Sequence, residues 1–210
     1  MKSGAATLLL GALLALAAPA RADQSWQFRV LLDDSEIGTH DYRIAERDGE
    51  RRVQIDARFI VTFLAVEVYR YVHTATERWH GNCLDNIDSR TDDNGELIAV
   101  HGKSSGGRFE VKTSAASTTT PGCMMTFAYW NPVFLSQHHL LNSQTGEVMD
   151  VRVDAIGDET LTVRGVPTPT RHYALQGTNL RIDLWYTQDG RWVQLESRTS
   201  RGSLLKYVLR

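Results

Sequence analysis

Glu77, His138 and His139 are side chains in this sequence whose types could support hydrolysis. Carboxylates and imidazoles are common general acids and bases, so a cleft that brings these three together would predict proton transfer to a bound substrate. No catalytic motif surrounds them, and the sequence assigns no catalytic residue. An exported hydrolase is therefore an alternative to a non-catalytic function.

Metal and nucleotide chemistry find little support. His138 and His139 are neighbours, and adjacent side chains on a strand or helix point in different directions, so surface histidines are the simpler interpretation. Gly102-Lys103-Ser104 ends like a phosphate-binding loop, but Leu97 stands where that motif needs a glycine. The sequence predicts neither a metal nor a cofactor.

Two cysteines, Cys83 and Cys123, allow a single pairing. In an oxidising compartment they predict a structural disulfide, which stabilises a fold by closing a loop. A zinc site that includes His80 and a reactive thiol are the alternatives, although no Cys-x-x-Cys pair supports either.

Aromatic residues are the remaining chemical signal. Core packing explains most of them, but the inner face of a curled sheet can also surround an apolar ligand. The set comprises Trp26, Tyr69, Tyr71, Trp79, Tyr129, Trp130, Trp185, Tyr186, Trp192 and Tyr207. The predicted ligand is a lipid or another apolar small molecule, and the predicted ligand-binding residues are Trp79, Tyr129, Trp130 and Asn131.

The elements that must position these residues are strands. Apolar residues alternate with polar ones through much of the chain, most clearly from Val53 to Phe63, which is typical of strands with one buried face. Asp48-Gly49 and Asn94-Gly95 are hairpin turn signals. The run from Ser114 to Thr120 is predicted to be a surface loop, and Val148–Ile156 and Thr160–Arg164 are predicted to be separate strands. Asn131 can cap a short helix that begins at Pro132.

About a dozen strands with almost no helix predict an all-β protein. The expected architecture is a curled antiparallel sheet that forms a closed, half-open or spiral β-barrel with one short helix, because curling hides exposed edges. Alternation alone leaves open whether the interior is filled or hollow.

Residues 1–22 are typical of a cleaved secretory signal peptide, with Lys2, an apolar stretch and small residues before Asp23. The stretch is too short for a transmembrane anchor. Residues 23–210 are then a single β-barrel-like domain that is periplasmic or secreted. Without the signal, 21 basic residues face 25 acidic ones, a net charge of −4, which does not favour nucleic acid as a partner.

Four phrases carry a resemblance to a known group. They are Glu77-Arg78-Trp79-x-Gly81-x-Cys83-Leu84, Ser89-Arg90-Thr91-Asp92-Asp93-Asn94-Gly95, Tyr129-Trp130-Asn131, and Gly190-Arg191-Trp192-Val193 with Tyr207. The chain resembles exported bacterial proteins grouped as a domain of unknown function. It is more distantly similar to periplasmic β-spiral envelope-integrity proteins and to LolA/LolB-like half-barrels. The resemblance implies a curled antiparallel sheet, a structural disulfide and a non-catalytic envelope role, and it transfers no binding residues.

Together these observations predict a soluble periplasmic protein without catalytic activity. It would bind an apolar envelope ligand or an envelope protein and support envelope maintenance. An exported hydrolase and a protein-interaction scaffold with an exposed sheet edge are the alternatives.

Overall fold

Fourteen β-strands and one short 3-10 turn make up the part of the chain that the computed structural model describes, residues 23–210. The predicted signal peptide, residues 1–22, lies outside the described residues. The elements are β1 (Gln24–Leu32), β2 (Ser35–Arg47), β3 (Glu50–Phe63), β4 (Val66–His80), β5 (Cys83–Asp93), β6 (Glu96–Ser105), β7 (Arg108–Lys112), β8 (Ser117–Pro121), η1 (Pro132–Ser136), β9 (His139–Leu141), β10 (Val148–Val163), β11 (Val166–Gly177), β12 (Leu180–Thr187), β13 (Trp192–Arg198) and β14 (Leu204–Leu209). No helix among these residues is long and apolar enough to cross a membrane.

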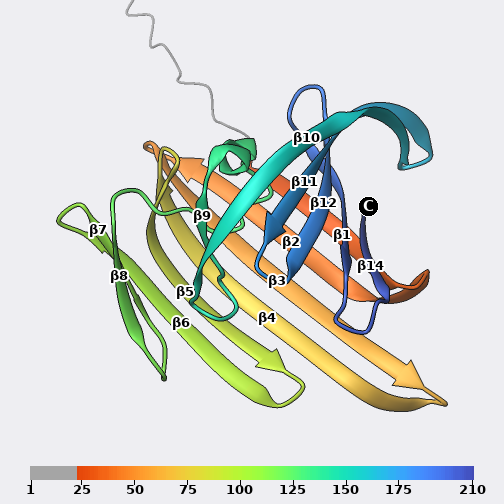
Figure 1. The fold of residues 1–210 in the computed structure, drawn as a ribbon, viewed down its shortest axis with the longest axis horizontal. Coiled ribbons are helices and arrows are strands. Elements are labelled where there is room, and N and C mark those ends of the chain that lie inside the picture. Colours follow the sequence, from red (N-terminus) through yellow and green to blue (C-terminus); the bar gives the residue numbers. More distant parts are fainter. Residues whose placement is uncertain (1–22) are drawn as a thin grey trace, which may run out of the picture.

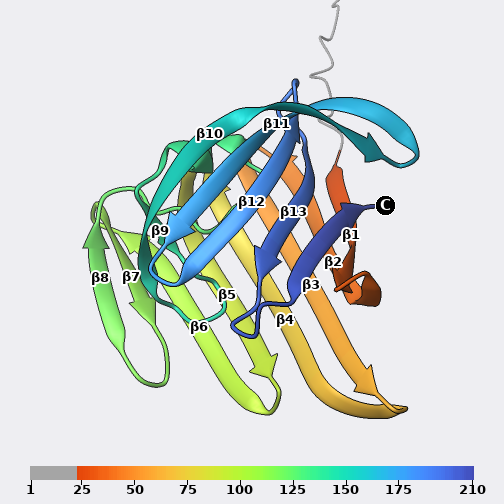
Figure 2. The same cartoon turned by 45° about the vertical axis from the view of Figure 1, so that its right-hand side comes forward.

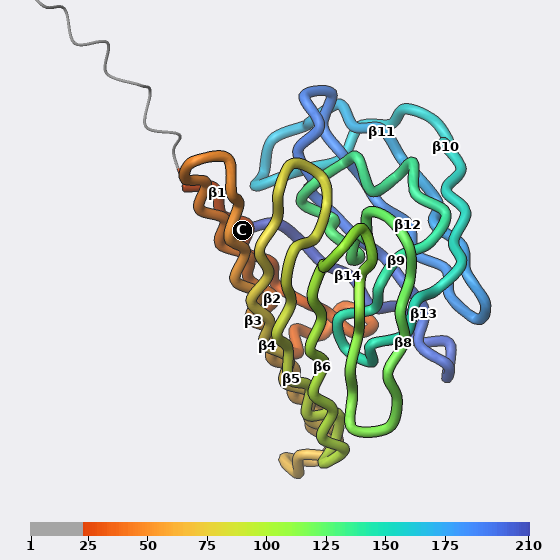
Figure 3. The backbone as a smooth tube through the Cα atoms, turned by 90° about the vertical axis from the view of Figure 1, so that its left-hand side faces the viewer, coloured from red at the N-terminus to blue at the C-terminus, as the bar shows by residue number. Residues whose placement is uncertain are grey.

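The strands form one antiparallel sheet in the order β8-β7-β6-β5-β4-β3-β2-β1-β14-β13-β12-β11-β10-β9. Strands β1 and β14 pair in the middle, with Phe28 opposite Leu209. The sheet curls so that β2–β6 form one wall and β10–β13 a facing wall (Figure 3). The edge strands β8 and β9 do not pair with each other among the described residues. The predicted curled all-β sheet is confirmed, and its closed-barrel alternative is wrong.

Strand β3 shows why the sequence forms this sheet. Val53, Ile55, Ala57 and Phe59 are buried, while the polar residues between them are exposed. Because successive side chains of a strand point to opposite faces, this pattern fixes which face of β3 forms the core. The register is equally fixed, because a slip by one residue would expose the whole apolar set.

Aromatic rings fill the middle of the curled sheet, where β1 and β14 meet. The Phe28 and Trp192 ring centroids lie 4.1 Å apart, and those of Tyr42 and Trp192 lie 5.5 Å apart. Tyr129 comes from the segment between β8 and β9 and lies 5.1 Å from Trp192. Side chains therefore occupy much of the interior, and core packing explains most of the aromatic set.

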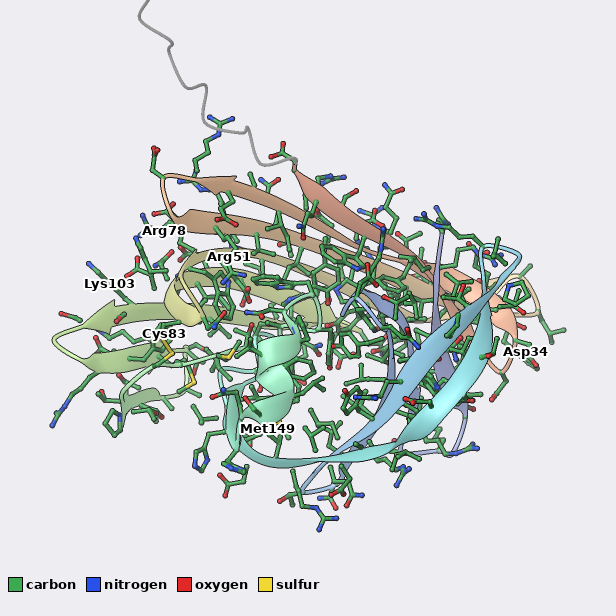
Figure 4. The ribbon with its side chains drawn as sticks, turned by 90° about the horizontal axis from the view of Figure 1, so that it is seen from above. Asp34, Arg51, Arg78, Cys83, Lys103 and Met149 are labelled. Atoms are coloured by element: carbon green, nitrogen blue, oxygen red, sulfur yellow. A yellow bond between two sulfur atoms is a disulfide. The ribbon has the colours of Figure 1, made fainter. Side chains whose placement is uncertain are left out.

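The segment between β8 and β9 connects the two walls. Cys83 at the start of β5 forms a disulfide with Cys123, which Figure 4 shows beside η1, so neither cysteine is a free thiol. Beyond the disulfide, Leu84 N donates to Met124 O and Leu141 N donates to Met125 O. These contacts hold the interior segment against both β5 and β9.

The predicted short helix is a 3-10 turn, η1. Asn131 caps it by accepting a hydrogen bond from Val133 N at 3.3 Å, and Pro132 is its first residue. The cap and the proline were the correct signals, but the turn ends after Ser136 because Gln137 is extended.

Two predictions of secondary structure were wrong in detail, one of a loop and one of a strand break. Residues 114–120 are not all loop, because Ser117–Pro121 form the edge strand β8 against β7. Threonine favours strands even without an apolar face to bury. Val148–Ile156 and Thr160–Arg164 were expected as separate strands, yet one strand, β10, runs through both, with a bulge near Gly157.

Candidate functional site

A hollow of about 180 Å³ lies between the two walls of the sheet, and we call it the chamber. Strands β2, β3 and β4 supply one side, β12 supplies another, and the segment between β8 and β10 supplies the rest. Its lining consists of His40, Tyr42, Ile55, His73, Glu77, Thr126, Phe127, Tyr129, Asn142, Ser143, Gln144, Leu180 and Ile182. Three of these, His40, His73 and Glu77, are buried histidine or acidic side chains.

Glu77 is fully buried. Its Oε2 atom accepts a hydrogen bond from Trp79 Nε1 at 2.9 Å, whereas Oε1 has no hydrogen-bond partner among the described residues. Burial raises the pKa of Glu77 to about 7, and the nearby polar groups of Trp79 and Thr126 offset that rise only in part. The carboxyl group can therefore act as a donor or as an acceptor near neutral pH.

His73 is held in one tautomer by its neighbours. The Thr91 hydroxyl donates its hydrogen to Gln144 O at 3.2 Å, so it can only accept from His73 Nδ1, 3.0 Å away. Nε2 is then an acceptor, and Ser143 Oγ lies 3.4 Å from it. Burial lowers the pKa of His73 to about 4, so the ring is neutral at pH 7.

His40 has the least satisfied side chain in the chamber. Its ring stacks on Tyr42 with centroids 4.6 Å apart, but neither ring nitrogen has a hydrogen-bond partner among the described residues. Burial, reinforced by the charge of His73, lowers the pKa of His40 to about 3. A neutral imidazole offers one donor and one acceptor, and buried polar atoms of this kind are normally paired with protein, water or ligand.

The chamber can therefore offer hydrogen bonds to a neutral polar group, beside apolar and aromatic side chains such as Phe127 and Ile182. Its volume is smaller than the roughly 300–1,000 Å³ of pockets that enclose drug-sized ligands. It suits a small molecule or the polar end of a larger one.

The four predicted ligand-binding residues do not form one site. Tyr129 lines the chamber, and Trp79 lies fully buried where it donates to Glu77. Trp130 and Asn131 line a separate hollow of about 150 Å³ that Arg51 also borders.

Trp130 and Asn131 also have structural roles around that second hollow. The Trp130 ring packs edge-on against Trp79 with centroids 5.4 Å apart, and the Arg51 guanidinium lies over the Trp130 ring, 5.0 Å from its centroid. Asn131 Nδ2 donates to Asn82 Oδ1 at 3.2 Å. Figure 4 labels Arg51 near Cys83, which places this hollow at the disulfide end of the sheet.

The three side chains that could have supported hydrolysis, Glu77, His138 and His139, do not come together. Glu77 lies inside the chamber, whereas His138 and His139 are exposed, and His139 Nδ1 lies 2.6 Å from Asp150 Oδ1. Ser143 and His73 form a closer pair, but a base whose pKa is lowered to about 4 removes a proton from serine poorly at neutral pH. Gly102-Lys103-Ser104-Ser105-Gly106 matches the serine-hydrolase elbow pattern, yet it covers the end of β6 and the start of the turn to β7 rather than a strand-to-helix turn.

Sequence reasoning did not select His40 or His73. A usable signal was present, because each stands at an inward position of an alternating strand: His40 two residues before Tyr42, and His73 between Tyr71 and Ala75. A polar residue at a core-facing position of a strand is the exception that points to a site.

A larger hollow of about 540 Å³ lies on the outer face of β2–β6. Its exposed charges are largely paired with each other: Arg43 with Asp56 at 3.3 Å, and His101 with Asp88 at 2.7 Å. Exposed pairs of this kind are solvated and weakly coupled. Among the described residues, no group of three or more histidine, cysteine or acidic side chains could hold a metal ion.

These features define a class: an open, curled antiparallel sheet that resembles a β-barrel and holds a small chamber lined by both polar and apolar side chains. A crystal structure of a beta-barrel-like protein of domain of unknown function DUF1849 from Brucella abortus shares the fold, with a TM-score of 0.67 at 10% identity over 90% of this chain and 95% of that one. The chain itself belongs to the family described as a domain of unknown function, DUF6134, whose model matches residues 28–210. The comparison with curated proteins found no match. The likeness to LolA/LolB-like half-barrels stays a prediction.

Proposed function

We propose that this protein is a non-catalytic binding protein of the cell envelope that holds a small ligand, or the polar end of a larger one, in the chamber. The observation that carries the proposal is that buried polar atoms of Glu77 and His40 face the chamber without a partner among the described residues. Leaving such atoms unpaired costs about 1–3 kcal/mol each. A ligand that pairs with them recovers that cost on binding.

The chamber favours a narrower chemical class of ligand than the lipid-like molecule expected from the sequence. An entirely apolar molecule would leave Glu77 and His40 unpaired, so the chamber favours an amphipathic molecule that carries both a hydrogen-bond donor and an acceptor, such as a hydroxyl or amide group. Phe127 and Ile182 would contact the adjoining apolar part. The small volume places any acyl chain mostly outside the chamber.

An extracytoplasmic location is part of the proposal. It is supported by the composition of residues 1–22 and by the disulfide between Cys83 and Cys123, since disulfides persist in oxidising compartments. A role in envelope maintenance is the corresponding proposal for the process that the protein serves.

Native mass spectrometry of the protein purified gently from its own periplasm tests the ligand. We expect an adduct on the wild type that is weakened about tenfold or more in Glu77→Gln and His40→Phe, because loss of a buried hydrogen bond costs about 1–3 kcal/mol. His101→Gln on the outer face is the matched control and should retain the adduct. A clean protein mass, or an adduct equally strong in the chamber variants, would overturn the proposal.

A further inference from the structure

The end of the β3–β4 hairpin stands free of the rest of the sheet. Pairing of β2 with β3 stops at Gly38 and Phe59, and pairing of β4 with β5 stops at Tyr71 and Asp93. Residues 60–70 form the end of this hairpin, and their hydrogen bonds to the neighbouring strand and turn lie at its base, where Arg70 O accepts from Asn94 N, Arg70 N donates to Asn94 Oδ1 and the Tyr69 hydroxyl donates to Asp93 Oδ1. We call residues 60–70 the finger, which Figures 1 and 2 show as the projecting end of β3 and β4.

The finger is unusually apolar for an exposed hairpin. Its exposed apolar side chains are Ile60, Phe63, Leu64, Val66 and Val68, and the exposed fraction reaches 66% at Phe63 and 83% at Leu64. Alternation along β3 puts Phe63 on the same face as buried Phe59, and Ile60 on the opposite face. At the tip, Phe63 pairs with Val66 on that same face, Thr62 pairs with Glu67 on the opposite face, and Leu64 and Ala65 form the projecting turn.

The turn at the tip contains residue types that its backbone conformation disfavours. Leu64 and Ala65 have φ of 49° and 62°, a conformation that two-residue hairpin turns normally assign to Asn-Gly or Asp-Gly. Asp48-Gly49 and Asn94-Gly95 follow that rule in the neighbouring turns. A leucine placed where the backbone disfavours it, and where no core receives it, is expected at a functional position.

We propose that the finger inserts into the interfacial region of a lipid bilayer and seats the protein on a membrane surface. A bilayer interface can receive the projecting apolar turn while Thr62 and Glu67 stay among the polar headgroups, whereas a protein partner would need a matching groove. Arg58 and Arg70 are exposed at the base of the finger and have no ion pair among the described residues. They would reach lipid phosphates while Phe63 and Leu64 lie deeper. This proposal does not depend on a ligand in the chamber.

The β10–β11 hairpin provides an internal control. Val166 is 60% exposed and follows the two-residue turn Arg164-Gly165, just as Val66, 62% exposed, follows Leu64-Ala65. The two valines therefore have the same chemistry, exposure and place in a hairpin, but only Val66 belongs to the finger.

Flotation of the full mature protein with vesicles of phosphatidylethanolamine and phosphatidylglycerol tests the proposal. We expect the wild type to float with the vesicles, and Leu64→Asn with Ala65→Gly to bind about tenfold more weakly, which corresponds to about 1.4 kcal/mol. This double variant should be at least as heat-stable as the wild type, because Asn-Gly suits the positive φ values. Val66→Ser should weaken binding severalfold, and Val166→Ser should leave it unchanged.

Equal flotation of the wild type and the Asn-Gly variant would overturn the proposal, as would a wild type that never floats. Self-association of the wild type that the Asn-Gly variant abolishes, without vesicle binding, would assign the finger to a second copy of the chain instead. Loss of the chamber adduct with flotation intact would count against the proposed ligand alone, so the two proposals fail separately.

Discussion

The inner chamber and the outer hollow are built from the same kinds of side chain, yet they differ in what those side chains experience. In the chamber, burial lowers the pKa of His40 to about 3 and raises that of Glu77 to about 7. On the outer face, His101 and Asp88 form a pair whose side chains are both about 60% exposed. Enclosure, rather than residue type, distinguishes a candidate site from a solvated surface.

Removing the disulfide that helps to hold the chamber walls together should have the largest effect on stability. Replacing Cys83 and Cys123 with serine removes a loop constraint worth about 4 kcal/mol in the chain-entropy model. We expect denaturant unfolding at pH 7 to show a loss of that order. Equal unfolding curves for the variant and the wild type would mean that the remaining contacts of residues 124–141 hold the walls together without the disulfide.

The next largest effect should follow from His40→Phe under acid conditions. A buried histidine whose folded pKa is below its usual 6.5 supports the fold fully above pH 6.5 and loses that support as the pH falls toward 3. The slope is about 1.4 kcal/mol per pH unit. Between pH 7 and pH 4, the wild type should therefore lose about 3.5 kcal/mol more unfolding free energy than the variant loses. Parallel pH profiles for the two proteins would show that His40 is not shielded from solvent.

Glu77→Gln should have a somewhat smaller effect on stability. The stability difference from the wild type should change with pH in the opposite direction. The raised pKa means that Glu77 supports the fold fully below pH 4.5 and that this support is lost as the pH rises to about 7. Relative to the variant, the wild type should lose about 3 kcal/mol between pH 4.5 and pH 7.5. Denaturant unfolding across this range measures the difference, and a constant offset would contradict the buried state of the carboxyl.

The smallest effect should come from His101→Gln in the outer hollow. Exposed substitutions away from special features usually change stability by less than about 0.5 kcal/mol. At pH 7, the unfolding free energy of the variant should differ from that of the wild type by less than this limit, as measured by denaturant unfolding. A difference of several kcal/mol would show that the outer hollow is coupled to the fold and would remove the contrast between the two regions.

Local signals in the sequence predicted much of the fold. Alternation in β3 identified a strand and its buried face, and Asn131-Pro132 identified the start of η1. The cysteine count left one possible pairing. These signals depend only on residues that are close in sequence, where backbone geometry and side-chain type decide the outcome.

The chamber could not be predicted in the same way. Glu77 was named, but with His138 and His139 as partners, because the sequence does not show that β2 and β4 bring His40 and His73 to the same interior. The pairing of β1 with β14 was also invisible, since it depends on how far the sheet curls. Long-range contacts of this kind depend on the register of many strands at once.

The pairing of β1 with β14 also sets the order in which the molecule can mature. Neighbouring strands elsewhere in the sheet are close in sequence and can form hairpins as soon as their residues are available, whereas this ladder joins the two ends of the described chain. Contacts between distant residues carry the largest loop-closure cost and slow folding. Strand β14 is the last strand of the chain, so the direct pairing of the two walls through β1 and β14 must wait for the carboxyl end of the chain.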